Sequence, residues 1–442
     1  MAENSVPEPS PRPRNWTPLP KCHSIPPGTA VSWGETAMSD GDFDQAIVTP
    51  ARPTLIGLLV GGRVLPDLAA RVGIRLARWY GKPFRFLRWV IAVRHAQAAD
   101  VLARDLEFGI APVNAAKIGE VNGGPFILGM DRSAALERER RGLYEALAAV
   151  DLDRLRAETA ADIEAVLADV PAGGEIDAVG GYARPVAART ARRLFGLHAP
   201  SERMLMEVAR SVFNHTFINP LNDKAIRARA VRAGEIMKSW IDAEIERRDP
   251  ADPGGDMIGR LIAQGLLDKG TIQRTIGGTF VGAIDTTATV VAKLVKLAAG
   301  DPDIAYAMRR DADDLPRLYG WCLDALRLWP HNPALLRSAL ADATIAGVQV
   351  RRGDTVVAWT QAAMQDSSVF YEPRRVHPDR ARSIYLHLGG GLHPCAGRAV
   401  NAFQIPLLVG GLVRRGLVGA GGISWAGPFP NRLPVVLGEG PR

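Results

Sequence analysis

The sequence has very little cysteine. Only three cysteines, Cys22, Cys322 and Cys395, occur among 442 residues, and they lie far apart. An odd number of widely separated cysteines argues against a disulfide framework as the basis of the fold. The protein is therefore expected to work in a reducing compartment such as the cytoplasm.

The sequence also lacks a long hydrophobic run. The strongest early run, residues 55–60, is closed by Arg63 and Pro66. It is far shorter than the roughly 20 residues of a membrane-spanning helix. Residues 1–30 are polar and proline-rich, without the apolar centre of a secretory signal. We therefore expect no transmembrane anchor and a cytoplasmic protein, with at most a weak interfacial contact through residues 55–65.

The sequence also lacks a region of concentrated charge. The formal net charge is +7, and the basic residues are dispersed among acidic ones. Proteins that bind nucleic acid carry a basic stripe on a recognisable module, and because neither is present no nucleic-acid partner is expected. A basic face that docks an acidic electron-transfer protein is one use of this charge, and solubility alone is the other.

What the sequence does contain is typical of a globular protein with a large core, since 47% of its residues are hydrophobic and 23% are charged. Residues 1–64 are interpreted as an irregular extension, and residues 65–442 as one large domain. Apolar residues at three- and four-residue steps predict helices over 95–102, 132–149, 151–169, 183–195, 201–213, 223–248, 256–264, 271–299, 315–329 and 396–415. Short strands are predicted over 84–87, 88–93, 343–345, 348–350 and 354–357. Because helices and strands do not alternate, we predict a mostly α fold with small β-sheets.

The segment from Leu388 to Arg398, Leu-Gly-Gly-Gly-Leu-His-Pro-Cys-Ala-Gly-Arg, carries the clearest chemistry. Its glycines allow a sharp bend and a close approach to a flat ligand. Cys395 is predicted at the start of a helix, where free amides and the positive helix end would stabilise a thiolate. An anionic sulfur of this kind can bind iron.

Three other interpretations of this cysteine loop were weighed. A phosphate cradle would need a following Gly-Lys-Ser/Thr, which is missing. A zinc site built from His387, His393 and Cys395 lacks a fourth ligand at a usual spacing. A buried, inert thiol is the commonest state of a lone cysteine and stays open at this point.

A second motif lies in the long helix predicted over 271–299. Gly282 and Ala283 are small and would leave space beside a ligand. Asp285 followed by Thr286 is unfavourable in the middle of a helix and needs a local reason. Thr286 could donate back to a carbonyl and Asp285 could relay protons. An incidental polar helix face is the alternative.

Together these segments resemble the cytochrome P-450 family. Gly389, Gly391, His393, Cys395 and Gly397 match its haem-binding signature, whereas Leu388 replaces the usual Phe. Residues 282–287 are similar to its oxygen-activation motif. The resemblance covers roughly residues 65–437 and implies the P-450 fold, with haem b between the oxygen-side helix and the helix that follows the cysteine loop. It makes Cys395 the iron ligand, Thr286 a stabiliser of oxygen at the iron, and Asp285 a proton donor.

The resemblance also implies a structural network. Asp324 and Arg327 stand where the family has Glu-x-x-Arg on a helix, and Arg375 lies in a stretch similar to Phe-x-x-Pro-x-Arg-Phe. We predict that Asp324, Arg327 and Arg375 tie the cysteine loop to the core, although the acid is one methylene shorter than usual.

Further positions follow from the same resemblance. Arg337 and His393 would contact the haem propionates, and Arg138 or Arg140 would replace a histidine that is missing here. Expected pocket walls are residues 110–128, residues 213–221, Ile284, Ala334, Leu335, Leu336 and residues 425–429. Because most of these are apolar, a hydrophobic substrate is favoured.

The implied reaction inserts one oxygen atom of O2 into an organic substrate, with electrons from NAD(P)H through a ferredoxin reductase and a ferredoxin, in a monomeric enzyme. Two alternatives remain. A haem-thiolate enzyme that uses peroxide would typically replace the Asp285–Thr286 pair. A haem-binding protein without turnover is the other, suggested by the departures at Asp324 and Leu388.

Overall fold

The computed structural model describes residues 43, 47, 72–76 and 79–438. The chain divides into two units, Met1–Ser39 and Asp40–Arg442, and only the second contains described residues. The boundary predicted between residues 64 and 65 and the apolar run 55–60 both lie outside the described residues. Among the described helices, none is long and apolar enough to cross a membrane.

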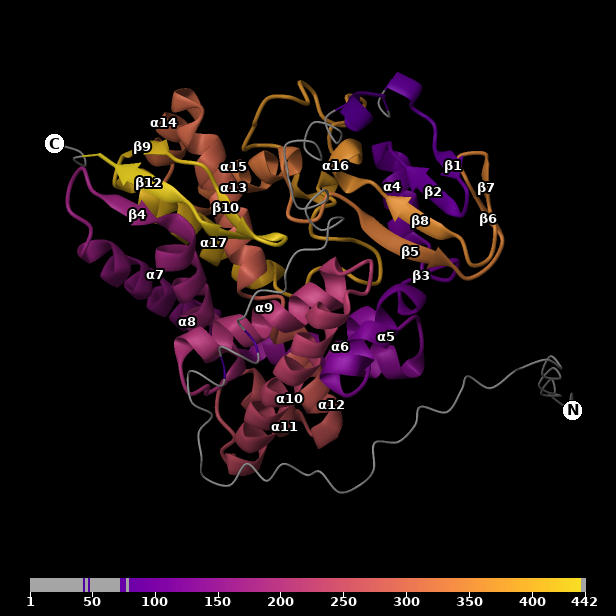
Figure 1. Ribbon diagram of the computed structural model, residues 1–442, viewed down its shortest axis with the longest axis horizontal. Helices are drawn as coiled ribbons and strands as arrows, with labels where there is room; N and C mark the ends of the chain where they lie inside the picture. Colours follow the sequence, from indigo (N-terminus) through magenta and orange to yellow (C-terminus); the bar gives the residue numbers. More distant parts are fainter. Residues whose placement is uncertain (1–42, 44–46, 48–71, 77–78, 439–442) are drawn as a thin grey trace, which may run out of the picture. The chain divides into compact units, whose positions relative to one another are not determined.

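The described chain is mostly helical, with four small sheets (Figure 1). The predicted helices are present as α4 (His95–Ala103), α6 (Ala134–Ala149), α7 (Leu152–Ala168), α8 (Arg184–Phe195), α9 (Glu202–Ile218), α10 (Lys224–Arg247), α11 (Met257–Gln264), α15 (Leu315–Leu328) and α17 (Arg398–Arg414). Three helices were not predicted: α5 (Ala111–Asn122), α14 (Pro302–Arg310) and α16 (Thr360–Ala363). A π-helical turn, Ala178–Ala183, leads directly into α8. The fold is therefore mostly α with small sheets, as predicted.

Most helices begin at a short polar side chain that accepts a hydrogen bond from a backbone amide of the first turn, which has no partner within the helix. Ser133 accepts from the amide of Leu136 at α6, and Ser201 accepts from Met204 at α9. Asp223 accepts from Ala225 and Ile226 at α10. These local signals explain why the helix starts could be placed from the sequence.

The single helix predicted over 271–299 is wrong. The structure has two helices, α12 (Lys269–Phe280) and α13 (Asp285–Ala299), separated by residues 281–284. The threonine hydroxyls of Thr286 and Thr287 donate to the carbonyls of Gly282 and Ala283, so they bind acceptors that the backbone of a continuous helix would use. Glycines at 277, 278 and 282 weaken the same stretch further.

The largest sheet has five strands in the order β1-β2-β8-β5-β3. Its strands are β1 (Phe84–Phe86), β2 (Trp89–Ala92), β3 (Phe108–Gly109), β5 (Leu335–Ala339) and β8 (Thr355–Ala358). The smaller sheets are β4-β12-β9, β10-β11 and β6-β7, formed by β4 (Glu175–Asp177), β6 (Ala343–Ile345), β7 (Val348–Val350), β9 (Leu417–Ala420), β10 (Ser424–Ala426), β11 (Phe429–Arg432) and β12 (Pro434–Leu437). Strands far apart in the chain are thus paired, since β2 runs parallel to β8.

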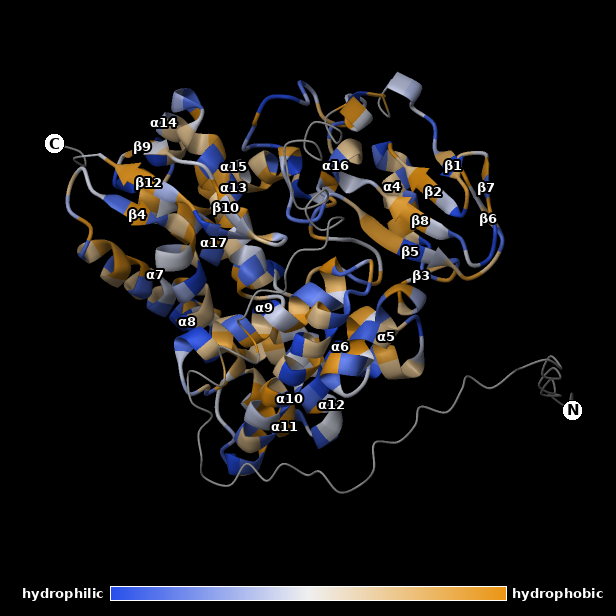
Figure 2. Cartoon of the chain, in the orientation of Figure 1, coloured by the Kyte–Doolittle hydropathy of each residue, from blue (hydrophilic) through white to orange (hydrophobic). Residues whose placement is uncertain are grey.

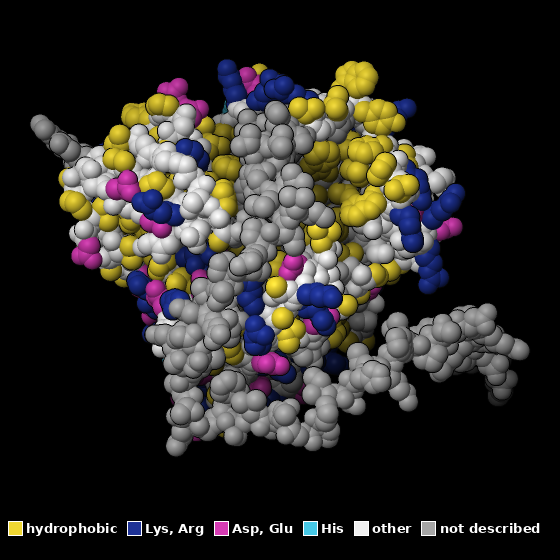
Figure 3. Space-filling view, in the orientation of Figure 1, with side chains coloured by type: hydrophobic (Ala, Val, Ile, Leu, Met, Phe, Trp, Pro, Cys, Tyr) yellow, Lys and Arg dark blue, Asp and Glu magenta, His cyan; other side chains and the backbone are white. Residues whose placement is uncertain are grey.

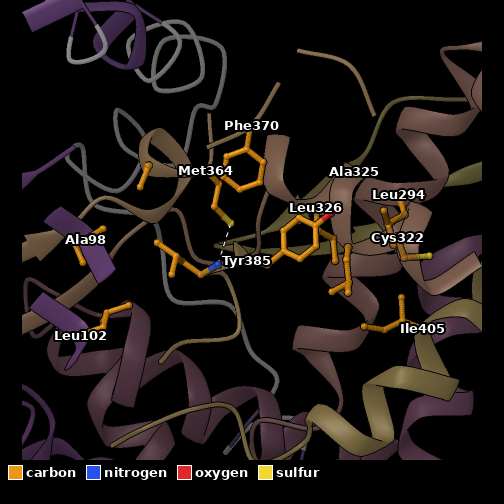
Figure 4. Close-up of a cluster of buried hydrophobic side chains, with 14 of the residues drawn as sticks. Ala98, Leu102, Leu294, Cys322, Ala325, Leu326, Met364, Phe370, Tyr385 and Ile405 are labelled. Atoms are coloured by element: carbon orange, nitrogen blue, oxygen red, sulfur yellow. Dashed lines mark hydrogen bonds between the residues drawn. The ribbon is translucent and has the colours of Figure 1, made fainter. Parts of the chain in front are cut away.

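The core joins this sheet to the helices that carry the site. Figure 2 shows strong hydrophobic colouring on β2, β5 and β8. Figure 4 shows buried side chains from α4, α13, α15 and α17, including Leu102, Leu294, Leu326 and Ile405. Tyr385 lies among them, just ahead of the cysteine loop. The loop is therefore attached to the same core as the helices on either side.

Candidate active site

The cysteine loop is held in a conformation that requires glycine. Gly389 and Gly391 have φ values of 71° and 63°, in the left-handed region. A Cβ on Gly391 would overlap the carbonyl oxygen of Leu102 at the end of α4. The amide of Cys395 donates to the carbonyl of Leu388 at 2.8 Å and closes the loop. The loop thus turns tightly against α4 and presents Cys395 before α17.

Cys395 lies three residues before α17, which begins at Arg398 rather than at residue 396 as predicted. Burial raises the pKa of the Cys395 thiol, while the amide of Gly397 and the charge of Arg398 oppose this rise. The Sγ atom is also 4.0 Å from the side-chain nitrogen of Asn401. These donors favour a thiolate once a cation offsets the cost of burial.

Arg337 and His393 act electrostatically on each other, and neither forms an ion pair among the described residues, although the charge of Asp131 acts on both. Arg337 is 5% exposed, and its one hydrogen bond goes to the carbonyl of Leu336 at 2.9 Å. Burial lowers the pKa of Arg337 to about 10. Burial and the neighbouring Arg337 charge lower the pKa of His393 to about 4, and its Nδ1 is buried without a hydrogen-bond partner. Two such groups side by side fit an anion.

Arg140, rather than Arg138, completes this basic cluster. The Arg140 guanidinium lies 5.1 Å from the ring of Tyr144, has a buried Nε without a hydrogen-bond partner, and acts electrostatically on His393. The hydroxyl of Tyr144 donates to the carbonyl of Pro394 at 3.4 Å. Arg138 is exposed on the other side of α6. The sequence left this choice open.

These groups fit haem b. A thiolate beside the metal, two carboxylate-binding basic groups and a glycine bend that admits a flat ring are what an iron porphyrin with propionates needs. Among the described residues, no group of three or more His, Cys, Asp or Glu side chains could hold a metal ion. The zinc site considered for His387, His393 and Cys395 is therefore not formed.

The helix break and the start of α13 carry several partly exposed residues. Gly282, Ala283 and Thr286 are partly exposed, and so is Val290 four residues further along α13. Thr286 and Val290 lie on one face of α13 because they are four residues apart, and Gly282 and Ala283 lie in the break before it. The Thr286 hydroxyl donates to the carbonyl of Gly282. Ile284, predicted as a pocket wall, is completely buried and offers no surface on this face.

Asp285 lies in a buried ion network that the sequence did not predict. Its Oδ1 is 2.9 Å from Nε of Arg184 on α8 and 2.6 Å from Nη2 of Arg210 on α9. Arg184 in turn binds Glu207 at 3.0 Å. Asp285 is 2% exposed, and its Oδ2 is buried without a hydrogen-bond partner in the described chain.

The Asp324–Arg327 contact is present. Arg327 binds Asp324 in a bidentate manner, at 2.9 Å from Nε to Oδ1 and 3.2 Å from Nη2 to Oδ2, and both side chains are fully buried. The Tyr385 hydroxyl donates to Oδ1 at 3.0 Å, and the amide of His377 donates to Oδ2 at 2.7 Å. The shorter acid is thus fully satisfied, which a buried charge requires.

Arg375 is not the third charged member of this network. Its guanidinium is 73% exposed and lies 3.3 Å from Glu372. Arg380 takes that place, with its Nε 3.1 Å from Oδ1 of Asp324. Arg375 contributes only its carbonyl, which accepts from Nη2 of Arg327 at 2.8 Å. The motif spacing pointed to the wrong arginine because the chain reverses direction between these two residues.

The strand predicted to line the pocket, β5, turns its residues alternately to two faces of the sheet. Leu335 and Arg337 point to one face of β5, where Leu335 packs against the core. Leu336 points to the opposite face, as alternation along a strand demands, and is 37% exposed. Leu336 therefore lies away from Arg337, contrary to its predicted role. Ala334 comes just before the strand and is partly exposed.

Aromatic side chains gather at the predicted substrate side. The ring of Phe213 on α9 lies 4.8 Å from Phe217 and 5.9 Å from both His331 and Phe429. Residues 213–221 and 425–429 were both predicted as pocket walls, and these contacts bring them together. The cation of Arg210 lies 5.4 Å from the Phe429 ring, so the aromatic group adjoins the Asp285 network.

The sequence did carry a signal for the missed residues. Arg210 stands among Val208, Ala209 and Val212 on the buried face of α9. An arginine on an apolar helix face requires a buried acidic partner, and Asp285 is such an acid in the middle of another apolar segment. Pairing the two from the sequence needs knowledge that α9 and α13 are neighbours.

Comparisons with known proteins agree with this geometry. The family model described as Cytochrome P450 matches residues 201–415. The chain is 24% identical over 296 residues to cytochrome P450 105A3 of Streptomyces carbophilus, a match that covers 65% of this chain and 68% of that protein. It is 27% identical over 190 residues to a mycinamicin IV hydroxylase/epoxidase of Micromonospora griseorubida, covering 41% of this chain and 47% of that protein.

Solved structures share the fold. The crystal structure of CalO2 aligns with a TM-score of 0.74 and 22% identity, covering 89% of this chain and 100% of that one. A mutant of P450 EryK in complex with erythromycin B aligns with a TM-score of 0.70 and 20% identity, covering 85% and 98%. The family model, the curated relatives and the shared fold together support the assignment of the chain to the cytochrome P450 family.

Proposed function

We propose that this protein inserts one oxygen atom of O2 into a hydrophobic organic substrate. The observation that carries the proposal is the helix break before α13, where Thr286 bonds back to Gly282 on the partly exposed face of the helix. A hydroxyl held in this way keeps its oxygen lone pairs directed toward the site. Haem, when bound, supplies the binding of dioxygen and the transfer of its oxygen atom.

The chain's own residues hold and orient the cofactor. Cys395 would supply an anionic sulfur ligand to the cofactor, and Gly389 and Gly391 give the loop that carries it a tight bend. Arg337, His393 and Arg140 offer positive charge and ring nitrogens to the carboxylates at the edge of the cofactor. This cluster would hold those carboxylates through charge-assisted hydrogen bonds.

Asp285 and Thr286 transfer protons from solvent to the site. Oδ1 of Asp285 is occupied by Arg184 and Arg210, so the carboxylate is held by two cations. Release of either arginine would free the carboxylate to take a proton from solvent and pass it to the hydroxyl of Thr286. Because Arg210 contacts Phe429, substrate packed against the aromatic group can influence this release.

The substrate and the electron donors follow from the same site. The rings of Phe213, Phe217 and Phe429 favour an apolar substrate, which can include an aromatic group. Two electrons would come from NAD(P)H through a ferredoxin reductase and a ferredoxin in the cytoplasm, with the enzyme as a monomer. Exposed basic residues such as Arg398 and Arg138 suit an acidic ferredoxin.

The test uses the full chain loaded with haem. A thiolate-type absorption spectrum of the reduced, carbon monoxide-bound protein is expected, and it should be lost in Cys395→Ala. A spectrum typical of histidine-ligated haem in the wild type would overturn the assignment of the iron ligand.

Turnover is measured next with a surrogate ferredoxin and reductase and a set of lipids, terpenoids and aromatics. Substrates are chosen by the shift they cause in the ferric spin state. Incorporation of one labelled oxygen atom from 18O2 is expected. Product formed with peroxide alone, and none with O2 and electron donors, would favour the peroxide-using alternative. Binding without product under both conditions would favour a haem protein without turnover.

A further inference from the structure

The five-stranded sheet is apolar on both faces. One face, with Val90, Ala92 and Val356, is buried against the core. The strand register places Phe84, Phe86, Trp89, Ile91 and Leu336 together on the other face. Sheets with one face in water normally carry polar residues there. Here Phe86 is 66% exposed and Trp89 is 45% exposed.

The exposed apolar surface extends beyond the sheet. Leu87, at the tip of the β1–β2 hairpin with φ of 53°, is 75% exposed. Trp79 is 85% exposed, and Tyr80 and Leu76 are more than half exposed. Figure 3 shows hydrophobic side chains gathered at the upper right, where Figure 1 places β1 and β2. We call Leu76, Trp79, Tyr80, Phe86, Leu87 and Trp89 the hairpin surface.

The chain segment that carries the hairpin surface has charge of one sign. Residues 72–99 contain no Asp or Glu. Arg75, Lys82 and Arg88 are exposed within it. Arg85 pairs with the buried Asp354 at 2.7 Å, so the nearest acid is neutralised and faces inward. An exposed apolar tip with a basic border is complementary to a surface that is negatively charged outside and apolar beneath.

We propose that the hairpin surface docks on the surface of a membrane that contains anionic phospholipid. Trp and Tyr favour the interface between headgroups and acyl chains, and Phe and Leu at a protruding tip can enter the apolar layer. Lys and Arg bind the anionic headgroups. A second copy of this chain would bring the basic borders together and is disfavoured by their repulsion. The docking is peripheral and does not depend on the proposed reaction.

The sequence adds a feature in the segment that precedes the hairpin surface along the chain. The run Leu55-Ile56-Gly57-Leu58-Leu59-Val60 and Arg63 precede it in the chain and have the same apolar and basic character. Such a segment is too short to span a bilayer and suited to its interface. A hydrophobic substrate dissolved in lipid would then be close to the enzyme.

Vesicle flotation with the full-length, haem-loaded protein tests the proposal. Vesicles of equal parts phosphatidylglycerol and phosphatidylcholine are expected to bind the protein, and phosphatidylcholine vesicles to bind it at least tenfold more weakly. Lys82→Gln and Arg88→Gln should each weaken binding to the mixed vesicles about fivefold. Phe86→Ser combined with Leu87→Ser should weaken it at least tenfold on both kinds of vesicle.

Two controls keep the result interpretable. Tyr371→Ser and Val418→Ser remove exposed hydrophobic side chains elsewhere, 77% and 66% exposed, and should leave binding unchanged. The reduced carbon monoxide spectrum of every variant should match the wild type, because the hairpin surface lies outside the core. No binding of the folded wild type to mixed vesicles overturns the proposal. So does a dimer in sedimentation that Phe86→Ser with Leu87→Ser abolishes.

Discussion

Replacing Arg380 and Arg375 separately distinguishes the network seen in the structure from the one expected from the sequence motif. Arg380 is about one-tenth exposed and holds Oδ1 of Asp324 at 3.1 Å, and its guanidinium lies 5.7 Å from the Phe370 ring. Arg375 is 73% exposed and makes one ion pair, with Glu372. Both lie in the segment that leads to the cysteine loop.

The expected magnitudes differ clearly. Arg380→Ala removes a charge-assisted contact to a buried carboxylate, which costs about 1.5–3 kcal/mol of unfolding free energy. The loss stays below the roughly 3–5 kcal/mol of a broken buried pair, because Arg327, Tyr385 and the His377 amide still bind Asp324. Arg375→Ala keeps the carbonyl that accepts from Arg327 and removes only a surface ion pair, so a change within about 0.5 kcal/mol is expected.

Both effects are measured by unfolding each variant in urea and monitoring the release of haem. Arg380→Ala should lower the urea midpoint and the fraction of protein purified with haem, while Arg375→Ala should match the wild type in both. Arg380→Lys keeps the charge and should recover part of the loss. If Arg375→Ala is the more damaging change, the side-chain network described for Asp324 is wrong and the motif spacing was the better guide.

Three further outcomes are expected. Gly391→Ala should abolish haem incorporation, because its φ of 63° is strained for alanine and its Cβ would overlap the Leu102 carbonyl, whereas Gly390→Ala, whose Cβ would lie 3.8 Å from Leu102, should retain haem in the same spectrum. Thr286→Ala should leave haem binding intact and lower product formed per NAD(P)H oxidised by about 10²-fold, since the hydroxyl is lost from the proton path; equal coupling in mutant and wild type would remove Thr286 from that path. Burial lowers the pKa of His387 in the folded protein from its ordinary value of 6.5 to about 4. As the pH falls, His387 is therefore protonated in the unfolded chain before it is protonated in the folded one. The apoprotein should therefore lose up to about 1.4 kcal/mol of stability per pH unit between pH 6.5 and 4 from this group. His387→Leu should reduce the slope of the unfolding free energy against pH in that range. An unchanged slope would show that His387 is not the group responsible.

Features set by local sequence could be predicted well. Helices α6, α9 and α10 were placed because Ser133, Ser201 and Asp223 cap apolar repeats. The cysteine loop was predicted because its glycines, His393 and Cys395 match a family signature, and Gly389 and Gly391 do adopt backbone conformations that other residues avoid. In both cases the cause of the structure lies within a few residues of its effect.

Features set by distant contacts could not be predicted. The break between α12 and α13 depends on where Thr286 and Thr287 direct their hydroxyls. The partners of Asp285 come from α8 and α9, and Arg210 is 75 residues away in the chain. Arg380 rather than Arg375 contacts Asp324 because of how the chain runs between them. The exposure of Leu336 depends on the face of β5 to which strand alternation turns it.

The parallel pairing of β2 with β8 has a consequence for synthesis on the ribosome. β2 (Trp89–Ala92) bonds to Thr355–Ala358, and His95 at the start of α4 bonds to the carbonyl of Ile384 at 2.8 Å, 289 residues later. The early strands therefore emerge long before their partners and must wait with an open edge. Because Gly391 closes against α4, the cofactor loop can form only when nearly the whole chain has been made. Fragments that end before the cysteine loop are expected to depend on chaperones and to be cleared, so no partly made chain would capture haem.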